Sequence, residues 1–98
     1  MNIVKTVKGS TVNIELEGRL DTTTAPDLES ELKGALPGAT DLILDFARLV
    51  YISSAALRVV LFAQKTMKKQ GKMVIRNVIP EVMDIFDMTG FSNILTIE

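Results

Sequence analysis

Residues 45–61 read Asp-Phe-Ala-Arg-Leu-Val-Tyr-Ile-Ser-Ser-Ala-Ala-Leu-Arg-Val-Val-Leu, and they join a predicted strand to a predicted helix. The strand, residues 41–46, is short and mostly apolar, which is typical of a strand covered on both faces of its sheet. The helix begins near Ala55, where an apolar segment with good helix formers extends to Ala63. We expect a short loop between the two elements, with the adjacent serines Ser53 and Ser54 at its end.

These two serines have two interpretations on spacing alone. A serine hydroxyl at the N-cap accepts a hydrogen bond from a free backbone N–H group, so Ser53 or Ser54 could simply cap the helix. The helix dipole also favours negative charge at this end, so a phosphate on either serine would be accommodated there. The spacing leaves both interpretations open.

The N-terminal part of the chain predicts a hairpin followed by a helix. Residues 3–7 and 11–17 are strand-like, the second with alternating apolar and polar residues, and a Lys-Gly-Ser turn separates them. Residues 22–24 are threonines that offer N-caps, and Thr24 and Asp27 have the spacing of a capping box. The helix should bury Leu28, Leu32 and Ala35, and Pro37-Gly38 should end it.

The C-terminal part predicts two more helices and two short strands. The central helix should run from Ser54 to Gln70, with Gly71 at its C′ position and a strand over residues 72–76. Pro80 should open a third helix that ends at Gly90, and residues 91–97 should form a final strand. The helix should point Val82, Ile85 and Phe86 inward and Glu81, Asp84 and Asp87 outward.

The order of elements is therefore ββαβαβαβ, which predicts one α/β domain over residues 1–98 with helices covering a mixed sheet. Ninety-eight residues suffice for one modest core, and 47% hydrophobic with 23% charged residues argues against disorder. The strand–helix–strand crossovers should be right-handed.

Charge and composition exclude several classes of protein. A net charge of -1 gives no global positive field for nucleic acid or an anionic membrane. The basic cluster of Lys65, Lys68 and Lys69 is interpreted as a solvated helix end, with a binding patch as the alternative. The absence of cysteine, of a signal-peptide pattern and of any apolar run near 18 residues predicts a cytoplasmic protein.

Catalytic chemistry has few candidates. Without His or Cys there is no Ser-His pair, no cysteine nucleophile and no zinc site with the usual ligands, and no glycine-rich phosphate loop occurs. Asp21, Asp41 and Asp45 lie near predicted strand ends, where we expect capping, turns and charge pairing rather than a Mg²⁺ site. We expect no cofactor, no metal and no enzymatic activity.

The pattern Asp-Phe-x-x-Leu-x-Tyr-Ile-Ser-Ser-Ala-x-Leu-Arg-Val-x-Leu over residues 45–61 resembles the signature of the STAS domain, and within it the bacterial anti-sigma-factor antagonists. Other segments resemble the family in the same order, so the resemblance covers nearly the whole chain. These segments are Gly18-Arg-Leu-Asp21 followed by Ala25 and Leu28, Gly71-Lys-Met-Val-Ile75, Val82, Ile85, Gly90-Phe91 and Ile94.

The resemblance implies partner switching. In such antagonists the unphosphorylated domain binds an anti-sigma factor that is also a serine kinase, phosphorylation reverses the binding, and a PP2C-type phosphatase resets it. The alignment places the phosphoacceptor on Ser54 and leaves Ser53 as the alternative, since Ser53 stands where many relatives have Asp and Ala56 where Gly is usual. The implied partner-binding residues are Asp21, Ser53, Ser54, Ala55, Arg58 and Phe62, on a monomer or weak dimer.

Other functions remain open within and outside this family. A STAS adaptor of a lipid-transport ABC system or of a stress-signalling complex is the first alternative, although such relatives often have Thr at the acceptor position. A domain that senses a nucleotide or lipid is the second, and a small molecule co-purifying with the protein would favour it. An enzyme would have to show turnover by the purified chain.

Overall fold

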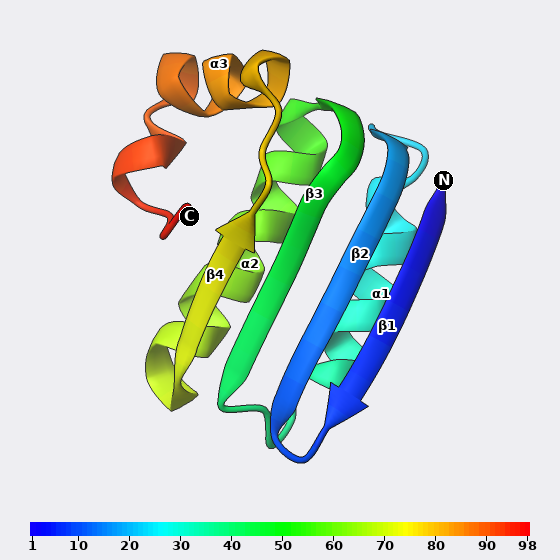
Figure 1. Ribbon diagram of the computed structural model, residues 1–98, viewed down its shortest axis with the longest axis vertical. Coiled ribbons are helices and arrows are strands. Elements are labelled where there is room, and N and C mark those ends of the chain that lie inside the picture. The colour runs from blue at the N-terminus through cyan, green and yellow to red at the C-terminus, as the bar shows by residue number, and fades with distance from the viewer.

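The computed structural model describes all 98 residues and contains one four-stranded sheet with three α-helices (Figure 1). The strands are β1 (Asn2–Lys8), β2 (Thr11–Leu20), β3 (Asp41–Ile52) and β4 (Lys72–Arg76), and they lie in this order across the sheet. The pair β1 and β2 is antiparallel, whereas β2, β3 and β4 are parallel. The predicted hairpin and the predicted mixed sheet are therefore confirmed.

Two helices cover one face of this sheet. Figure 1 shows α1 (Ala25–Ala35) and α2 (Ser54–Gln70) behind the strands, with α3 (Pro80–Thr89) across one end of the sheet. Leu28 and Leu32 of α1 are buried as predicted, whereas Ala35 is only half-buried. Inward-facing Phe86 of α3 packs on Phe46 of β3 with ring centroids 6.3 Å apart, which attaches α3 to the core.

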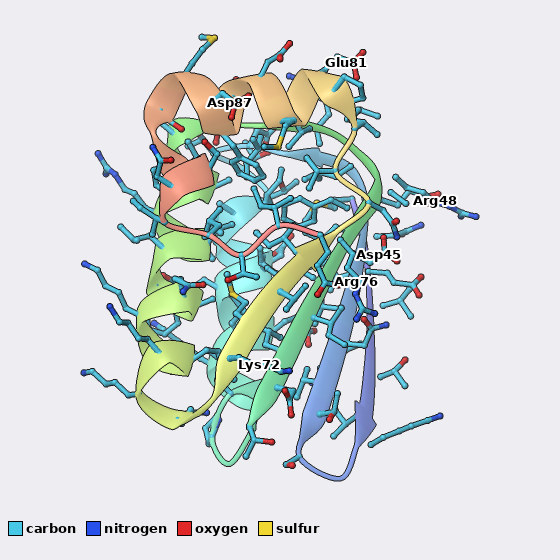
Figure 2. The ribbon with its side chains drawn as sticks, turned by 60° about the vertical axis from the view of Figure 1, so that its left-hand side comes forward. Asp45, Arg48, Lys72, Arg76, Glu81 and Asp87 are labelled. Carbon is cyan, nitrogen blue, oxygen red and sulfur yellow. The ribbon has the colours of Figure 1, made fainter.

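The other face of the sheet is open, so the prediction that residues 41–46 are covered on both faces is wrong. Along β3, Leu42, Leu44 and Phe46 are buried under the helices, while Ile43 and the aspartates on either side of it are only partly buried. Figure 2 shows Asp45, Arg48 and Arg76 on the side of the sheet away from α2. The segment thus alternates as a strand with one solvated face does.

The strand β3 is also longer than the sequence predicts, because it continues to Ile52 without the expected loop. Its pairing with β2 shifts register between Glu15 and Glu17 and again between Gly18 and Arg19. Such irregularities add a residue to one strand and bend it, so the simple alternation of inward and outward side chains is interrupted. Leu49 and Ile52 nevertheless return to the core.

Helix α2 has the predicted bounds, and Gly71 ends it for a steric reason rather than a left-handed conformation. The φ angle of Gly71 is 174°, which is extended backbone. A Cβ at this position would overlap the backbone of Thr40, whose carbonyl accepts a hydrogen bond from Lys72 N at 3.0 Å. Only glycine allows this close approach between the end of α2 and the start of β3.

The predicted final strand is wrong. Residues Phe91–Asn93 form a 3₁₀ helix, and only Ile97 makes a β-bridge, to Ile75 of β4. Two hydrogen bonds hold the C-terminus along the edge of β4: Ile75 N donates to Thr96 O at 2.9 Å, and Glu98 N donates to Ile75 O at 2.8 Å. No helix of the chain is long and apolar enough to cross a membrane.

Candidate functional site

The first of the two serines caps helix α2. Ser53 is the N-cap residue in an extended conformation, and its Oγ accepts a hydrogen bond from Ala56 N at 3.2 Å. Its N–H donates to Leu20 O at 2.9 Å, and its carbonyl accepts from Leu57 N at 2.9 Å. The half-buried Ser53 is therefore held through its hydroxyl, its amide and its carbonyl.

The second serine has a free hydroxyl. Ser54 is the first residue of α2, and its side chain is exposed. Its Oγ makes no hydrogen bond within the chain, whereas the hydroxyl of Ser53 provides the side-chain cap of α2. The structure thus gives the two serines different surroundings: one hydroxyl is part of the helix cap, and the other faces solvent at the positive end of the helix dipole.

Asp21 organises the loop before α1. Its Oδ1 accepts hydrogen bonds from Thr23 Oγ1 at 2.7 Å, from Thr23 N at 3.0 Å and from Thr24 N at 3.1 Å. These bonds, led by the one from the Thr23 hydroxyl, lower the pKa of the Asp21 carboxyl below its ordinary value. The carboxylate acts in a turn, as the sequence predicts, and its Oδ1 is engaged by its own loop.

The predicted capping box of α1 does not form. Thr24 occupies the N-cap position but makes no side-chain cap, because its Oγ1 donates to Arg19 O at 2.8 Å and accepts from Asp21 N at 2.8 Å. Asp27 is exposed. The hydroxyl that the sequence assigns to the helix instead ties the loop to the end of β2.

The loop of Asp21 and the start of α2 are neighbours, because both follow the carboxyl ends of adjacent parallel strands. The hydrogen bond between Ser53 N and Leu20 O joins them directly. A hollow of about 280 Å³ lies between α1 and α2, and its lining includes Pro26, Ala55 and Arg58. The half-buried Ala55 thus lies in the lining of this hollow.

Ser54, Arg58 and Phe62 follow one another at four-residue spacing on the exposed side of α2. Arg58 is exposed and makes no ion pair, and the side chain of Phe62 is 37% exposed. Of the predicted partner-binding residues, the structure therefore brings Ser54, Arg58 and Phe62 onto one continuous surface. Asp21 supports the adjacent loop.

One contact near the serines is not predicted by the sequence. The guanidinium of Arg19 lies over the ring of Tyr51, with Cζ 4.3 Å from the centroid. These residues are paired across β2 and β3, just before the loop of Asp21 and the N-terminus of α2. Only the register of two strands separated by a helix brings them together, and nothing in the local sequence signals that register.

The carboxylates at the other strand positions have structural partners. Asp45 Oδ1 accepts from Ala47 N at 3.0 Å and from Asn77 Nδ2 at 3.1 Å, and Asp41 lies 3.9 Å from Lys72 Nζ. No three acidic, His or Cys side chains converge into a group that could hold a metal ion. The turn and pairing roles expected of these aspartates are observed.

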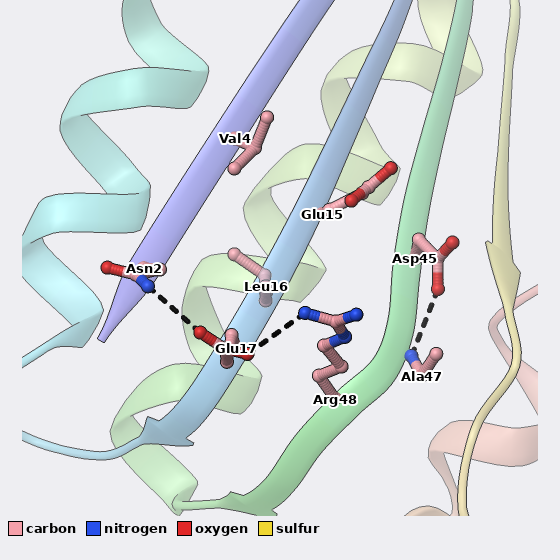
Figure 3. A pocket seen from close by; sticks show the side chains of 8 residues that line it. All are labelled: Asn2, Val4, Glu15, Leu16, Glu17, Asp45, Ala47 and Arg48. Carbon is pink, nitrogen blue, oxygen red and sulfur yellow. Dashed lines mark hydrogen bonds and ion pairs between the residues drawn. The ribbon is translucent and has the colours of Figure 1, made fainter.

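A hollow of about 320 Å³ on the open face of the sheet is built on polar contacts (Figure 3). Glu17 accepts from Asn2 Nδ2 at 2.9 Å and from a guanidinium nitrogen of Arg48 at 3.2 Å. The bond from Asn2, followed by the contact with Arg48, lowers the pKa of the Glu17 carboxyl. Within this hollow Glu17 is paired with Arg48, and the hollow lies on the face away from α2.

Comparison with known families decides where this arrangement belongs. The sequence model of the STAS domain matches residues 2–98, which is almost the whole chain. The chain belongs to the STAS domain family. The expected family and the expected α/β fold with a mixed sheet are both confirmed.

Two curated STAS relatives have names that concern sigma factors. The chain is 38% identical over 84 residues to BtrV of Bordetella bronchiseptica, named as a candidate anti-sigma factor antagonist, and the match covers 84% of this chain and 72% of BtrV. It is 29% identical over 100 residues to the anti-sigma-B factor antagonist of Bacillus subtilis, with 99% of this chain and 92% of the relative covered.

The fold is also that of a solved anti-sigma factor antagonist, SpoIIAA of Bacillus. The unphosphorylated form superimposes with a TM-score of 0.77 at 21% identity, covering 99% of this chain and 87% of that structure. The phosphorylated form gives a TM-score of 0.76 at 22% identity, covering 99% of this chain and 91% of that structure. At these identities the likeness concerns the fold.

Proposed function

We propose that this STAS protein is an anti-sigma factor antagonist that binds an anti-sigma factor while Ser54 is unphosphorylated and is released when Ser54 is phosphorylated. The observation that carries the proposal is the contrast between the two serines: Ser53 Oγ is engaged by Ala56 N, whereas Ser54 Oγ is exposed and free. The names of the two curated relatives support the partner class.

The partner must supply the phosphate. The anti-sigma factor, acting as a serine kinase, holds ATP, and Ser54 Oγ attacks the γ-phosphorus. A new O–P bond forms, the bond from the γ-phosphorus to the bridging oxygen breaks, ADP leaves, and a base of the kinase takes the hydroxyl proton. This chain contributes only a reachable hydroxyl, since it has no His, no Cys and no glycine-rich phosphate loop.

The phosphorylated site should keep its fold. A phosphoserine carries about -1.5 to -2 charges, and negative charge near a helix N-terminus is stabilised by about 0.3 to 1 kcal/mol. In a close protein interface the same charge must be desolvated or meet a complementary cation. The phosphate therefore weakens binding without removing the surface on which the partner docks.

A PP2C-type phosphatase would return the protein to its binding form. The chain itself acts as a binding partner without turnover, as a monomer or weak dimer in the cytoplasm. The adaptor and ligand-sensor alternatives have no specific support, since Ser rather than Thr occupies position 54 and the hollow at the start of α2 is shallow and open.

A pull-down from the native host, with and without ATP, tests the proposal. Wild-type protein should recover an anti-sigma factor that is lost after ATP is added, and peptide mass spectrometry should locate the phosphate on Ser54. Ser54→Ala should retain the partner in ATP, whereas Ser53→Ala should still be phosphorylated and released. Modification at Ser53 alone, or no sigma-factor regulator among the recovered proteins, would overturn the assignment.

A further inference from the structure

Helix α2 carries positive charge that nothing in the chain neutralises. Its 17 residues include four basic side chains and no acidic one. These are Arg58, Lys65, Lys68 and Lys69. None of the four is in an ion pair, whereas five other basic residues of the chain are paired with carboxylates. In a chain of net charge -1, unpaired positive charge is therefore concentrated on one helix.

Helical spacing places most of this charge on one exposed face. Arg58, Lys65 and Lys69 lie 4, 11 and 15 residues after Ser54, so they follow it along the same side of α2. Leu61 and Phe62 lie between them, and all five side chains line a shallow hollow of about 520 Å³. We call these five residues the basic stripe. Side chains ending in nitrogen extend from α2 away from the sheet (Figure 2).

The helix dipole does not explain the whole stripe. Cations are stabilised in the last turn of a helix, where Lys68 and Lys69 lie. Arg58 lies in the second turn, close to the positive end of the dipole, and Lys65 precedes the last turn. An interface whose centre is aromatic and whose rim is charged is a common arrangement for protein recognition, and Phe62 stands at such a centre.

We propose that the basic stripe docks an acidic surface of the anti-sigma factor, and that phosphate on Ser54 releases this partner by charge. The inference rests on the proposed function and adds the chemistry of the partner and of its release. A phosphate at the N-terminal end of the stripe adds about -1.5 to -2 charges beside three cations, so the net positive charge of this side of α2 falls by half or more. It also competes with the partner for Arg58, which lies one turn away.

The stripe is tested by charge reversal with a matched control. Binding of wild type, Lys65→Glu and Lys8→Glu to the anti-sigma factor recovered in the pull-down is measured by calorimetry at about 50 mM and 500 mM salt. Lys8 is also exposed and unpaired, but it lies at the end of β1. Lys65→Glu should weaken binding about tenfold or more at low salt and flatten the salt dependence, whereas Lys8→Glu should stay within about twofold of wild type.

The release mechanism is tested at Ser54 itself. Ser54→Asp should weaken binding at low salt and lose much of this effect at high salt, whereas the uncharged Ser54→Asn should bind within about threefold of wild type. If Ser54→Asn binds as poorly as Ser54→Asp, release is steric and the charge mechanism is wrong.

The possible failures are distinguishable. If no anti-sigma factor is recovered, the proposed function fails. If one binds with an affinity that neither salt nor Lys65→Glu changes, the function stands and the inference about the stripe is overturned. It is equally overturned if Lys65→Glu abolishes only binding to anionic vesicles, to DNA or to a second copy, which sedimentation and ultracentrifugation detect.

Discussion

Ser53 and Ser54 are neighbours in the sequence, but their hydroxyls have different surroundings, and the difference is measurable as stability. Ser53→Ala removes the hydrogen bond to Ala56 N and should lower the free energy of unfolding by about 0.5 to 2 kcal/mol. Ser54→Ala removes no bond and should change it by a few tenths of a kcal/mol at most. Urea unfolding with unchanged m-values provides the comparison, and equal losses for the two variants would contradict the assignment of the cap.

Arg58 lies one helical turn after Ser54, so its guanidinium can reach phosphate oxygens on that serine. A nearby cation favours the dianion and lowers the second pKa of the phosphoserine. In phosphorylated protein, Arg58→Ala should therefore raise this pKa, and Arg58→Lys, which keeps the charge but not the planar fork, should raise it less. Titration followed by ³¹P NMR gives the values. Coincident curves for wild type and Arg58→Ala would show that Arg58 does not contact the phosphate.

Asp21 gives the stability a pH dependence at the acidic end. Its pKa is lower in the folded protein than its ordinary value of 3.8, mainly because of the Thr23 hydroxyl. The ionised carboxylate therefore stabilises the fold above the ordinary pKa, and this contribution is lost as the pH falls through the lower folded value. Asp21→Asn should be less stable than wild type at pH 7 and should lose less stability on acidification. Thermal melts between about pH 2 and 7 check this.

Glu17 sets the control for that titration, because its pKa is also lowered, by Asn2 and Arg48 on the open face of the sheet. Glu17→Gln, like Asp21→Asn, should lose less stability on acidification than wild type does. Its partner binding should not change, since Glu17 lies away from α2. If Asp21→Asn keeps the full acid dependence of wild type, the hydrogen bonds of its loop do not stabilise the fold.

At the scale of elements, the sequence predicts the bounds of an element best where capping or terminating residues mark both of its ends. Helix α2 starts after a serine cap and ends before Gly71, and the sequence predicts its bounds. Strand β3 was predicted too short because its pairing with β2 shifts register near Glu17. The C-terminal strand was wrong because only one residue, Ile97, meets the edge of β4. Register and edge pairing depend on distant segments, which local periodicity does not describe.

The junction between α2 and β4 tests the steric argument at this scale. Gly71→Ala would push a Cβ into the backbone of Thr40, so it should lower the free energy of unfolding by about 1 to 3 kcal/mol. Gly34→Ala is the matched control, since Gly34 lies in α1 with open space around it and should gain about 0.5 to 1 kcal/mol. Chemical denaturation measures both, and two variants of equal stability would refute the close approach at Gly71.

At the scale of the whole molecule, the site is assembled by topology. The resemblance implies that Ser54, Arg58 and Phe62 bind the partner together. A single helix carries all three, and the structure places them on one exposed side of it. The support from Leu20 and the loop of Asp21 depends on β2 and β3 being parallel neighbours across α1. The open face of the sheet was not predicted, since a short apolar strand has the same composition whether one or both faces are covered.

This arrangement makes the proposed switch a surface event, and the last prediction follows from that. Ser54 is exposed at the positive end of the α2 dipole, so Ser54→Asp should unfold in one cooperative transition with a Tm equal to wild type or raised by a few degrees. Ser54→Lys has the opposite charge at the same place and should lower the Tm by a similar amount. Calorimetry at low salt, where the dipole effect is least screened, measures both shifts. A broad transition or a lowered Tm for Ser54→Asp would mean that negative charge at this position destabilises the fold. Loss of the folded binding surface, rather than charge on the basic stripe, would then explain the release of the partner.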